Sequence, residues 1–291
     1  MKRKLVSQAG QALTITVPIE WIRSNGLSAG DEVDVQLFER ELILSSTNKV
    51  PGKKIKLELT NQPEKLSYVK LNAAYAKGVD EIELTGLYPD LKQNIGYAVV
   101  SQKQDKYVIR DVSGQTSENL DEILKRVFQM LINFYDSAIS DIFGPEKETI
   151  EGLNRRDEEI NKFVLFLQRA IIKMAHPDPA GGKIMFAYSY MLEIIGDEIL
   201  RLWRTNIQNK TKKDAKIKEL IMLSNQSLQK AFEVYYQENP ERMRELMVLR
   251  DNIRKKTSSM LKNNFSEIVL HANKIAEDAY DLTHLSLMKK I

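Results

Sequence analysis

Residues 4–46, KLVSQAGQALTITVPIEWIRSNGLSAGDEVDVQLFERELILSS, decide the fold of the N-terminal part of the chain. Apolar and polar residues alternate through 13–17 and again through 33–37, which is typical of half-buried strands. Pro18 marks the start of a short helix and Gly26 marks its end. The stretch therefore predicts four short extended runs with one helix in the middle.

The same residues resemble the swapped-hairpin DNA-binding domain of the AbrB/SpoVT/MazE family. The family pattern is a strand that ends in Thr/Ile-Pro, a short helix, Leu-Gly-Leu and then Gly-Asp-x-Val. The matching segments are Gln11–Pro18 (QALTITVP), Trp21–Arg23 (WIR), Ser24–Leu27 (SNGL) and Ser28–Val33 (SAGDEV). Because a unit this small cannot bury a hydrophobic core by itself, we expect it to fold with a second copy. The resemblance implies a dimeric DNA-binding domain over residues 1–48.

The opening residues carry the positive charge that a DNA-binding surface needs. Within the first thirty residues, four cations stand against one acidic residue, Glu20, and a dimer doubles this excess. Neutralisation of DNA phosphates supplies most of the affinity that does not depend on base sequence. The alternative is that residues 1–4 are an ordinary solvated N-terminus. The candidate DNA contacts are Lys2, Arg3, Lys4 and Arg23 for phosphates, and Gln8, Gln11 and Thr14 for base edges.

The composition limits the possible classes of protein and of site. A length of 291 residues suggests two or three domains, and a net charge of +3 argues against a general nucleic-acid binder. The absence of cysteine excludes disulfides, thiolate zinc sites and cysteine nucleophiles. No apolar segment follows the basic N-terminus, and the most apolar stretch, 184–202, contains three acidic residues. We therefore expect a cytoplasmic protein that does not insert into a membrane.

Residues 47–53 (TNKVPGK) predict a linker, and residues 54–115 predict a small α/β domain. Its glycines, Gly78, Gly86 and Gly96, are too scattered to form a phosphate-binding loop. The expected elements are strands at 54–59, 80–84 and 107–112, a helix at 63–79 and a weaker helix at 91–100.

From residue 117 onward the apolar residues recur at helical spacing. The expected helices cover 120–142, 150–171, 183–206, 217–235, 241–262 and 265–290, with a loop at 176–182. A polar, basic run at 206–213 separates two groups of three helices, which indicates repeats at about 117–206 and 213–291. The chain is therefore predicted to be an α+β multidomain protein: a swapped-hairpin β domain, a small α/β domain and an all-α six-helix bundle.

Two of the expected helices each carry a pair of carboxylates one turn apart. Glu193 and Asp197 share one face of the third helix, and Glu277 and Asp281 share one face of the sixth. Like charges at this spacing repel each other unless a cation or hydrogen-bond donors lie between them. Both pairs border apolar positions, so they are candidate oxygen ligands for Mg²⁺, Mn²⁺, iron or Zn²⁺.

These pairs and the helices around them resemble the PhoU family, whose two three-helix repeats carry Glu-x-x-x-Asp motifs within Leu-Glu-Arg-Ile-Gly-Asp. Leu192–Asp197 (LEIIGD) is a close match and Ala276–Asp281 (AEDAYD) a looser one. The family also places an acidic motif on the middle helix of each repeat. The corresponding residues are Asp157 and Asn161 in the first half, and Asp251 and Lys255 in the second. The resemblance covers residues 117–291 and implies a PhoU-like helical regulator of phosphate uptake.

The resemblance also implies two metal sites of unequal quality. Lys255 supplies a cation in the second half, which favours a salt-bridge network there, unless His284 adds a ligand. The alternatives are a solvated helix edge paired with Arg201 or Arg204 for the first pair, and a rim position for His284. The candidate ligands of a divalent or iron ion are Asp157, Asn161, Glu193 and Asp197 for the first site, and Asp251, Glu277, Asp281 and His284 for the second.

Together the two predicted domains resemble the AbrB–PhoU fusions typical of archaea. They imply a DNA-binding transcriptional regulator of phosphate uptake, in which the helical sensor contacts a phosphate-transporter ATPase subunit or a kinase. The alternative is an adaptor that binds such a partner without DNA, the N-terminal domain serving only for dimerisation. An enzyme is not expected, because the chain offers no nucleophile beside a plausible base, and His271 is expected to serve packing.

Overall fold

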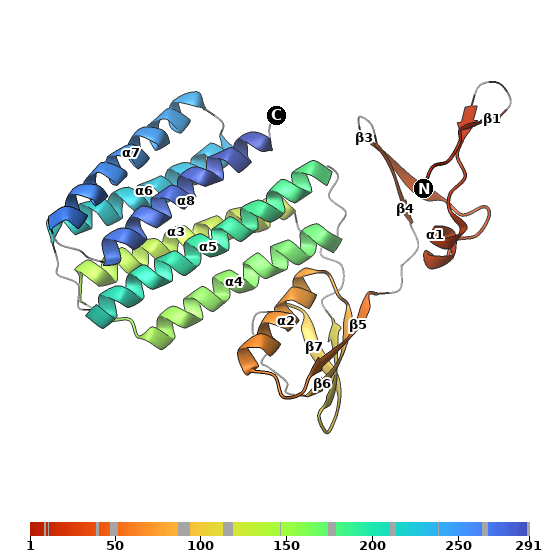
Figure 1. Cartoon of the computed structure of the whole chain (residues 1–291), viewed down its shortest axis with the longest axis horizontal. Helices are drawn as coiled ribbons and strands as arrows, with labels where there is room; N and C mark the ends of the chain where they lie inside the picture. The colour runs from red at the N-terminus through yellow and green to blue at the C-terminus, as the bar shows by residue number, and fades with distance from the viewer. Residues whose placement is uncertain are drawn as a thin grey trace. The chain divides into compact units, whose positions relative to one another are not determined.

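The computed structural model describes residues 1–8, 10, 12–38, 41–46, 52–86, 94–112, 119–145, 147–173, 179–209, 214–237, 239–263 and 267–289. The chain forms two compact units, Met1–Lys53 and Lys54–Ile291, which Figure 1 colours from red to blue along the sequence. We call the first the N-terminal unit. The second contains a small α/β layer, residues 54–112, followed by a helical bundle.

The N-terminal unit consists of two antiparallel hairpins with a short helix between them. Its elements are β1 (Val6–Gln8), β2 (Ala12–Thr14), α1 (Ile19–Ser24), β3 (Val33–Phe38) and β4 (Glu41–Ser46). The carbonyl of Pro18 accepts the first hydrogen bonds of α1, and Gly26 follows the helix with φ +63°. That left-handed conformation suits glycine, so both punctuating residues act as the sequence predicts.

The N-terminal unit has almost no hydrophobic core of its own. Among its described hydrophobic residues, only Leu27 is buried. Leu37 is 80% exposed and Leu13 64% exposed, although the alternation around them predicts half-buried strands. Within the described residues of the unit, nothing buries these side chains. The expectation that the unit needs another apolar surface therefore follows from the structure as well as from its size.

The α/β layer is a four-stranded sheet in the order β5-β6-β8-β7, with α2 packed on it. Its elements are β5 (Lys54–Leu59), α2 (Glu64–Ala76), β6 (Glu81–Gly86), β7 (Tyr97–Lys103) and β8 (Lys106–Asp111). β5 and β6 are parallel, whereas β8 is antiparallel to both β6 and β7. The prediction of a helix at 91–100 is wrong for the residues that the structure describes, because residues 97–100 belong to β7. Tyr97 is buried there against the edge of Tyr75, so tertiary packing decides the conformation.

In the described residues, six long helices form the bundle, which Figure 1 shows. They are α3 (Leu120–Phe143), α4 (Ile150–Lys173), α5 (Pro179–Asn209), α6 (Ala215–Tyr236), α7 (Pro240–Asn263) and α8 (Glu267–Met288). Helices α3–α5 pack on one another, as do α6–α8, and the pairs α3–α6 and α5–α8 join the two groups. One continuous hydrophobic core runs through all six. The α+β class, with N-terminal strands followed by a helical region, is confirmed.

Helix α5 begins earlier than the sequence pattern predicts. It starts at Pro179 and includes Gly181 and Gly182, which were expected to belong to a loop. Proline is favourable in the first turn of a helix, where its missing N–H has no partner to lose. Both glycines are buried, so packing outweighs their helix-propensity cost of about 1 kcal/mol each. No helix in the described ranges is long and apolar enough to cross a membrane.

Candidate functional site

The predicted DNA-contacting residues lie on the surface of the N-terminal unit. Arg23 and Gln8 are exposed, and so is the basic N-terminal segment. Thr14 is also exposed, but its hydroxyl donates a hydrogen bond to the carbonyl of Val6 at 3.2 Å and thereby closes the β1–β2 hairpin. Gln11 lies outside the described residues. The predicted phosphate contacts Lys2, Arg3, Lys4 and Arg23 are all exposed.

The Gly-Asp sequence at residues 30–31 shapes the chain between α1 and β3. The backbone N–H of Ser28 donates to the carboxylate of Asp31 at 2.7 Å, and the N–H of Asp31 donates to the carbonyl of Ser28 at 3.1 Å. Gly30 has φ +99°, which disfavours other residues. The carboxylate of Asp31 therefore helps to close the turn between α1 and β3.

The predicted metal ligands of the first half come from two packed helices. Asp157 and Asn161 lie on α4, and Glu193 and Asp197 lie on α5; we call these four the first acidic cluster. The amide of Asn161 donates to Oδ2 of Asp157 at 3.0 Å. Oδ1 of Asp157 and Oδ1 of Asn161 are buried and have no hydrogen-bond partner. Two oxygens of the cluster thus lack the donor that a buried polar atom normally has.

The electrostatics of this cluster show charge that the protein neutralises only in part. Burial, followed by the nearby charge of Asp197, raises the pKa of Asp157 to about 6, and Arg204 opposes this shift. Burial, followed by Asp197, also raises the pKa of Glu193. Asp197 itself accepts a hydrogen bond from Arg201 at 3.0 Å. The expected pairing of this helix edge with Arg201 is therefore present, while the more buried carboxyls have no cation bonded to them in the described residues.

The donor set of the first acidic cluster fits a hard cation in part. Carboxylate and amide oxygens are suitable ligands, and the two unpartnered oxygens would gain a partner. Against this, the described residues contain no group of three His, Asp or Glu side chains placed to hold a metal ion.

The second half has a different arrangement. Arg254 donates two hydrogen bonds to the carboxylate of Glu277, and Asp251 accepts from Arg250 at 3.0 Å. The prediction that Lys255 forms the salt bridge in the second half is therefore wrong, because the neighbouring Arg254 pairs with Glu277. Its planar fork matches a carboxylate better than an ammonium group does.

The remaining predicted ligands of the second half lie nearby on α8. His284 is exposed, and its ring contacts the edge of Tyr280. Asp281 is also exposed, one turn before His284. Since Arg254 already compensates the carboxylate of Glu277, this set fits a structural ion-pair network better than a metal site.

Sequence reasoning missed a buried polar connection between α5 and α8. Nδ1 of His271 lies 2.6 Å from Oε1 of Glu198, and its Nε2 lies 3.3 Å from the hydroxyl of Thr205. Burial raises the pKa of Glu198, but hydrogen bonds from His271 and Arg201 outweigh it, so that this pKa is lowered. The partners lie on helices far apart in sequence, so no local pattern could have revealed them. The connection joins the two halves of the bundle.

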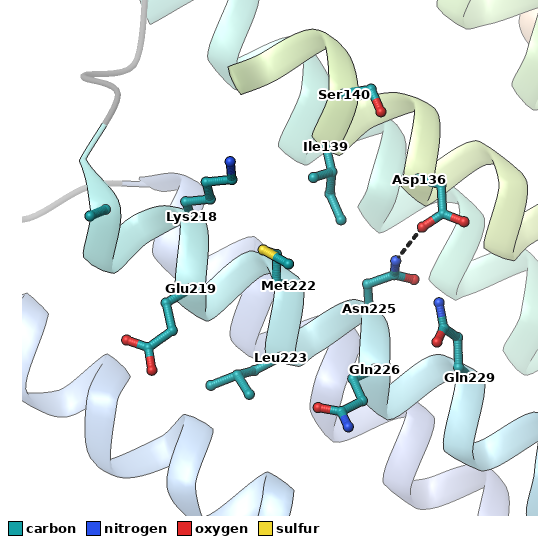
Figure 2. A pocket seen from close by; sticks show the side chains of 11 residues that line it. Asp136, Ile139, Ser140, Lys218, Glu219, Met222, Leu223, Asn225, Gln226 and Gln229 are labelled. Carbon is teal, nitrogen blue, oxygen red and sulfur yellow. Dashed lines mark hydrogen bonds between the residues drawn. The ribbon is translucent and has the colours of Figure 1, made fainter. Parts of the chain in front are cut away.

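A separate cavity of about 800 Å³ lies between α3 and α6 (Figure 2). Its wall combines amides, one hydroxyl and charged groups with apolar side chains such as Met222 and Ile139. The amide of Asn225 donates to the carboxylate of Asp136 at 2.5 Å, the contact dashed in Figure 2. None of the residues predicted as ligands lines this cavity. It is therefore separate from the first acidic cluster.

The raised pKa of Asp157 predicts a pH-dependent stability. A carboxyl whose pKa is higher in the folded state binds more protons when folded, so the free energy of unfolding falls as pH rises from about 4 to above 6. In metal-free protein, Asp157→Asn should therefore increase that free energy by about 3 kcal/mol at pH 8 and leave it unchanged near pH 3. Denaturant unfolding at both pH values measures this, with Glu159→Gln on the exposed side of α4 as control. An equal effect at both pH values contradicts the assignment.

The comparisons with known proteins concern the N-terminal unit. A family model described as "Antidote-toxin recognition MazE, bacterial antitoxin" matches residues 6–55. The searches of curated proteins and of solved structures found no match for the chain. The matched segment contains both hairpins and α1, so the N-terminal unit is similar to the MazE domain. The helical bundle lies outside this match.

Proposed function

We propose that the chain is a dimeric DNA-binding transcriptional regulator whose DNA-contacting part is the N-terminal unit. The observation that carries this proposal is the MazE family match over residues 6–55, on a unit that leaves its apolar strand residues exposed. A second copy would cover those residues, and domains of this type dimerise and bind DNA. Pairing would also bring two sets of basic residues onto one DNA-binding surface.

Within this unit the exposed residues divide into two roles. Lys2, Arg3, Lys4 and Arg23 hold DNA phosphates, which fixes the position of the protein on the duplex. Gln8 and Thr14 on the hairpin, together with Gln11 between them in the sequence, contact base edges in a groove. The hydroxyl of Thr14 already donates to Val6, so it would face a base as an acceptor.

The helical bundle is proposed to be the sensor, acting in the cytoplasm on phosphate uptake. The support is the resemblance of residues 117–291 to PhoU and the two unpartnered oxygens of the first acidic cluster. A divalent or iron ion would bind Asp157, Asn161, Glu193 and Asp197, and a phosphate-transporter ATPase subunit or a kinase would be the protein partner. The ion would supply positive charge for carboxylates that the protein leaves incompletely neutralised. No enzymatic activity is proposed.

The metal proposal has a direct test. Protein purified without chelator should contain bound metal, and the variant Glu193→Gln/Asp197→Asn should contain at least about tenfold less, since it loses both ligands of α5. Elemental analysis measures both, with Glu277→Gln/Asp281→Asn as the matched pair in the second half. Equal metal content in wild type and the first variant contradicts the site.

The proposed regulation of DNA binding would arise because a ligand shifts the population between two arrangements of the protein. A ligand that binds one arrangement of the bundles better than another changes the spacing of the paired N-terminal units and hence the affinity for DNA. Such coupling requires that the ligand's affinity also depends on bound DNA, by the same factor.

The second candidate is an adaptor that uses the N-terminal unit for protein contacts alone. The description of the matched family, a toxin-recognising antitoxin, favours including it. Replacing residues 1–53 by an unrelated dimerisation segment separates the two candidates. A DNA-binding regulator loses duplex binding after the replacement, whereas an adaptor keeps its contact with a partner protein. Unchanged affinity for duplex DNA in the replaced chain contradicts our proposal.

A further inference from the structure

The cavity between α3 and α6 is a long hollow with two helical walls (Figure 2). Its lining residues on α6 run from Ala215 to Gln229, which is about 21 Å along the helix axis. The wall on α3 is shorter and runs from Asp136 to Ser140. Its volume of about 800 Å³ lies in the range of known ligand sites. The cavity is therefore long enough for an extended chain of about six residues.

Two charges of opposite sign stand apart in this cavity. Lys218 on α6 is exposed, and its described contact is the ring of Phe143, whose centroid lies 5.6 Å from the ammonium. Asp136 on α3 accepts a hydrogen bond from Asn225, which follows Lys218 by seven residues, or about 10 Å along the helix axis. None of the ion pairs among the described residues includes Lys218 or Asp136. The two walls thus present a cation and a carboxylate that no opposite charge compensates.

The amide of Asn225 has an oxygen without a partner. The residue is 6% exposed and lines the cavity; its nitrogen donates to Asp136, but its buried Oδ1 accepts no hydrogen bond within the described residues. A buried acceptor normally has a donor. Two further amides, Gln226 and Gln229, line the same wall. An amide side chain donates and accepts at once, so this group can pair with the N–H and C=O of a peptide backbone.

Apolar surface lies between the two charges. Met222 is placed on α6 between Lys218 and Asn225 and is 53% exposed, and Ile139 stands across from it on α3. The flexible thioether of methionine adapts to apolar groups of different shape. The middle of the cavity therefore suits an apolar side chain.

These features favour one kind of occupant. Among the described lining residues, the carboxylates Asp136 and Glu219 outnumber the single cation Lys218, which disfavours a nucleic acid. A helix has its backbone groups paired internally and would leave the amides without backbone partners. A purely apolar ligand would leave them unpaired as well. An extended peptide offers free backbone groups to the amides and side chains to both walls.

We propose that this cavity binds an extended segment of a partner protein in which an acidic and a basic residue stand three positions apart. Three extended residues span about 10 Å, and side chains three positions apart point to opposite sides of the segment. The acidic side chain pairs with Lys218 on α6 and the basic one with Asp136 on α3, while an apolar side chain between them packs on Met222. This inference rests on the proposed regulatory function of the bundle, for which it supplies the protein contact.

The test measures binding of fluorescent, end-capped hexapeptides to the full chain by anisotropy. Two peptides carry glutamate and lysine three positions apart with leucine between them, one in each order, because the chain direction in the cavity is free. A third has the same composition with the two charges adjacent. At least one of the first two should bind with a Kd of about 0.1 mM, and the third at least tenfold more weakly.

A charge reversal locates the site. Lys218→Glu should weaken binding of the preferred peptide by at least about tenfold, and a peptide with lysine in place of its glutamate should bind this variant at least about tenfold better than it binds wild type. Lys216→Glu is the matched control, because Lys216 is exposed on the same helix and does not line the cavity. This control should bind all peptides as wild type does.

Three results overturn the proposal: absence of binding for every peptide at millimolar concentration, equal affinity for spaced and adjacent charges, and no rescue of Lys218→Glu by the lysine peptide. Weaker self-association in Lys218→Glu would assign the cavity to a second copy and overturn it too. Duplex DNA binding is measured on the same proteins. It should stay at the wild-type value in Lys218→Glu, so a failure of peptide binding and a failure of the proposed DNA-binding function are distinguishable.

Discussion

Leu37→Glu is expected to convert the dimer into a monomer and thereby remove DNA binding. Leu37 is 80% exposed on β3, and burying a leucine contributes about 1.5–3 kcal/mol. A dimer contains the residue twice, and a carboxylate in its place would be desolvated without a partner. The dimer dissociation constant should therefore rise by roughly a hundredfold to ten-thousandfold. Sedimentation equilibrium measures this constant.

The control for this experiment is Val248→Glu on α7. Val248 is 64% exposed, so the substitution adds the same charge at a similarly accessible apolar position in the other unit. This variant should remain dimeric and bind DNA. A dimer of wild-type strength in Leu37→Glu would show that the exposed face of β3 is not an interface between copies.

The triple variant Lys2→Ala/Arg3→Ala/Lys4→Ala is expected to weaken binding to every duplex sequence tested. It removes six cations from a dimer, and each phosphate contact contributes about 0.9 to the slope of log K against log salt concentration. The slope should become shallower by about five, and affinity at low salt should fall by at least about a hundredfold. Fluorescence anisotropy with two unrelated duplexes measures both quantities.

The matched control removes the same charge elsewhere. Lys65, Lys77 and Lys103 are exposed residues of the α/β layer, so their triple alanine variant has the same net charge as the first. It should keep the wild-type slope. An equal loss in both variants would mean that binding follows overall charge and not the N-terminal unit.

Local sequence patterns predict the elements of this fold well where one local cause dominates. Pro18 and Gly26 delimit α1 through backbone preferences that act within a few residues. The six helices expected after residue 117 are present as α3–α8, because their apolar spacing is long and regular. The class of the fold follows from these local signals.

The secondary-structure predictions are wrong where contacts between segments distant in the sequence determine the local conformation. Residues 97–100 are a strand in which Tyr97 packs against Tyr75, and α5 starts at Pro179 with two buried glycines in its first turn. Neither the packing of Tyr97 nor the burial of the glycines is visible in a window of ten residues.

The candidate site likewise has features that local sequence predicts and features that only the packed structure reveals. The i, i+4 pairing of carboxylates places Glu193 with Asp197 and Glu277 with Asp281, which is a property of any helix. Whether Arg254 or Lys255 pairs with Glu277 depends on how α7 is rotated against α8. The hydrogen bond from Arg169 to the carbonyl of Tyr75 joins residues that are 94 positions apart in the sequence. Side-chain partners of this kind require the packed structure.

The most direct test of the central claim is the affinity of the full chain for duplex DNA over a salt series from about 0.05 to 0.3 M. The four predicted phosphate-contacting cations of each N-terminal unit give eight in a dimer, so the slope of log K against log salt concentration should be about −7. A steep slope of this size is the result that our account predicts. Absence of binding at the lowest salt concentration, or a slope near zero, would contradict it.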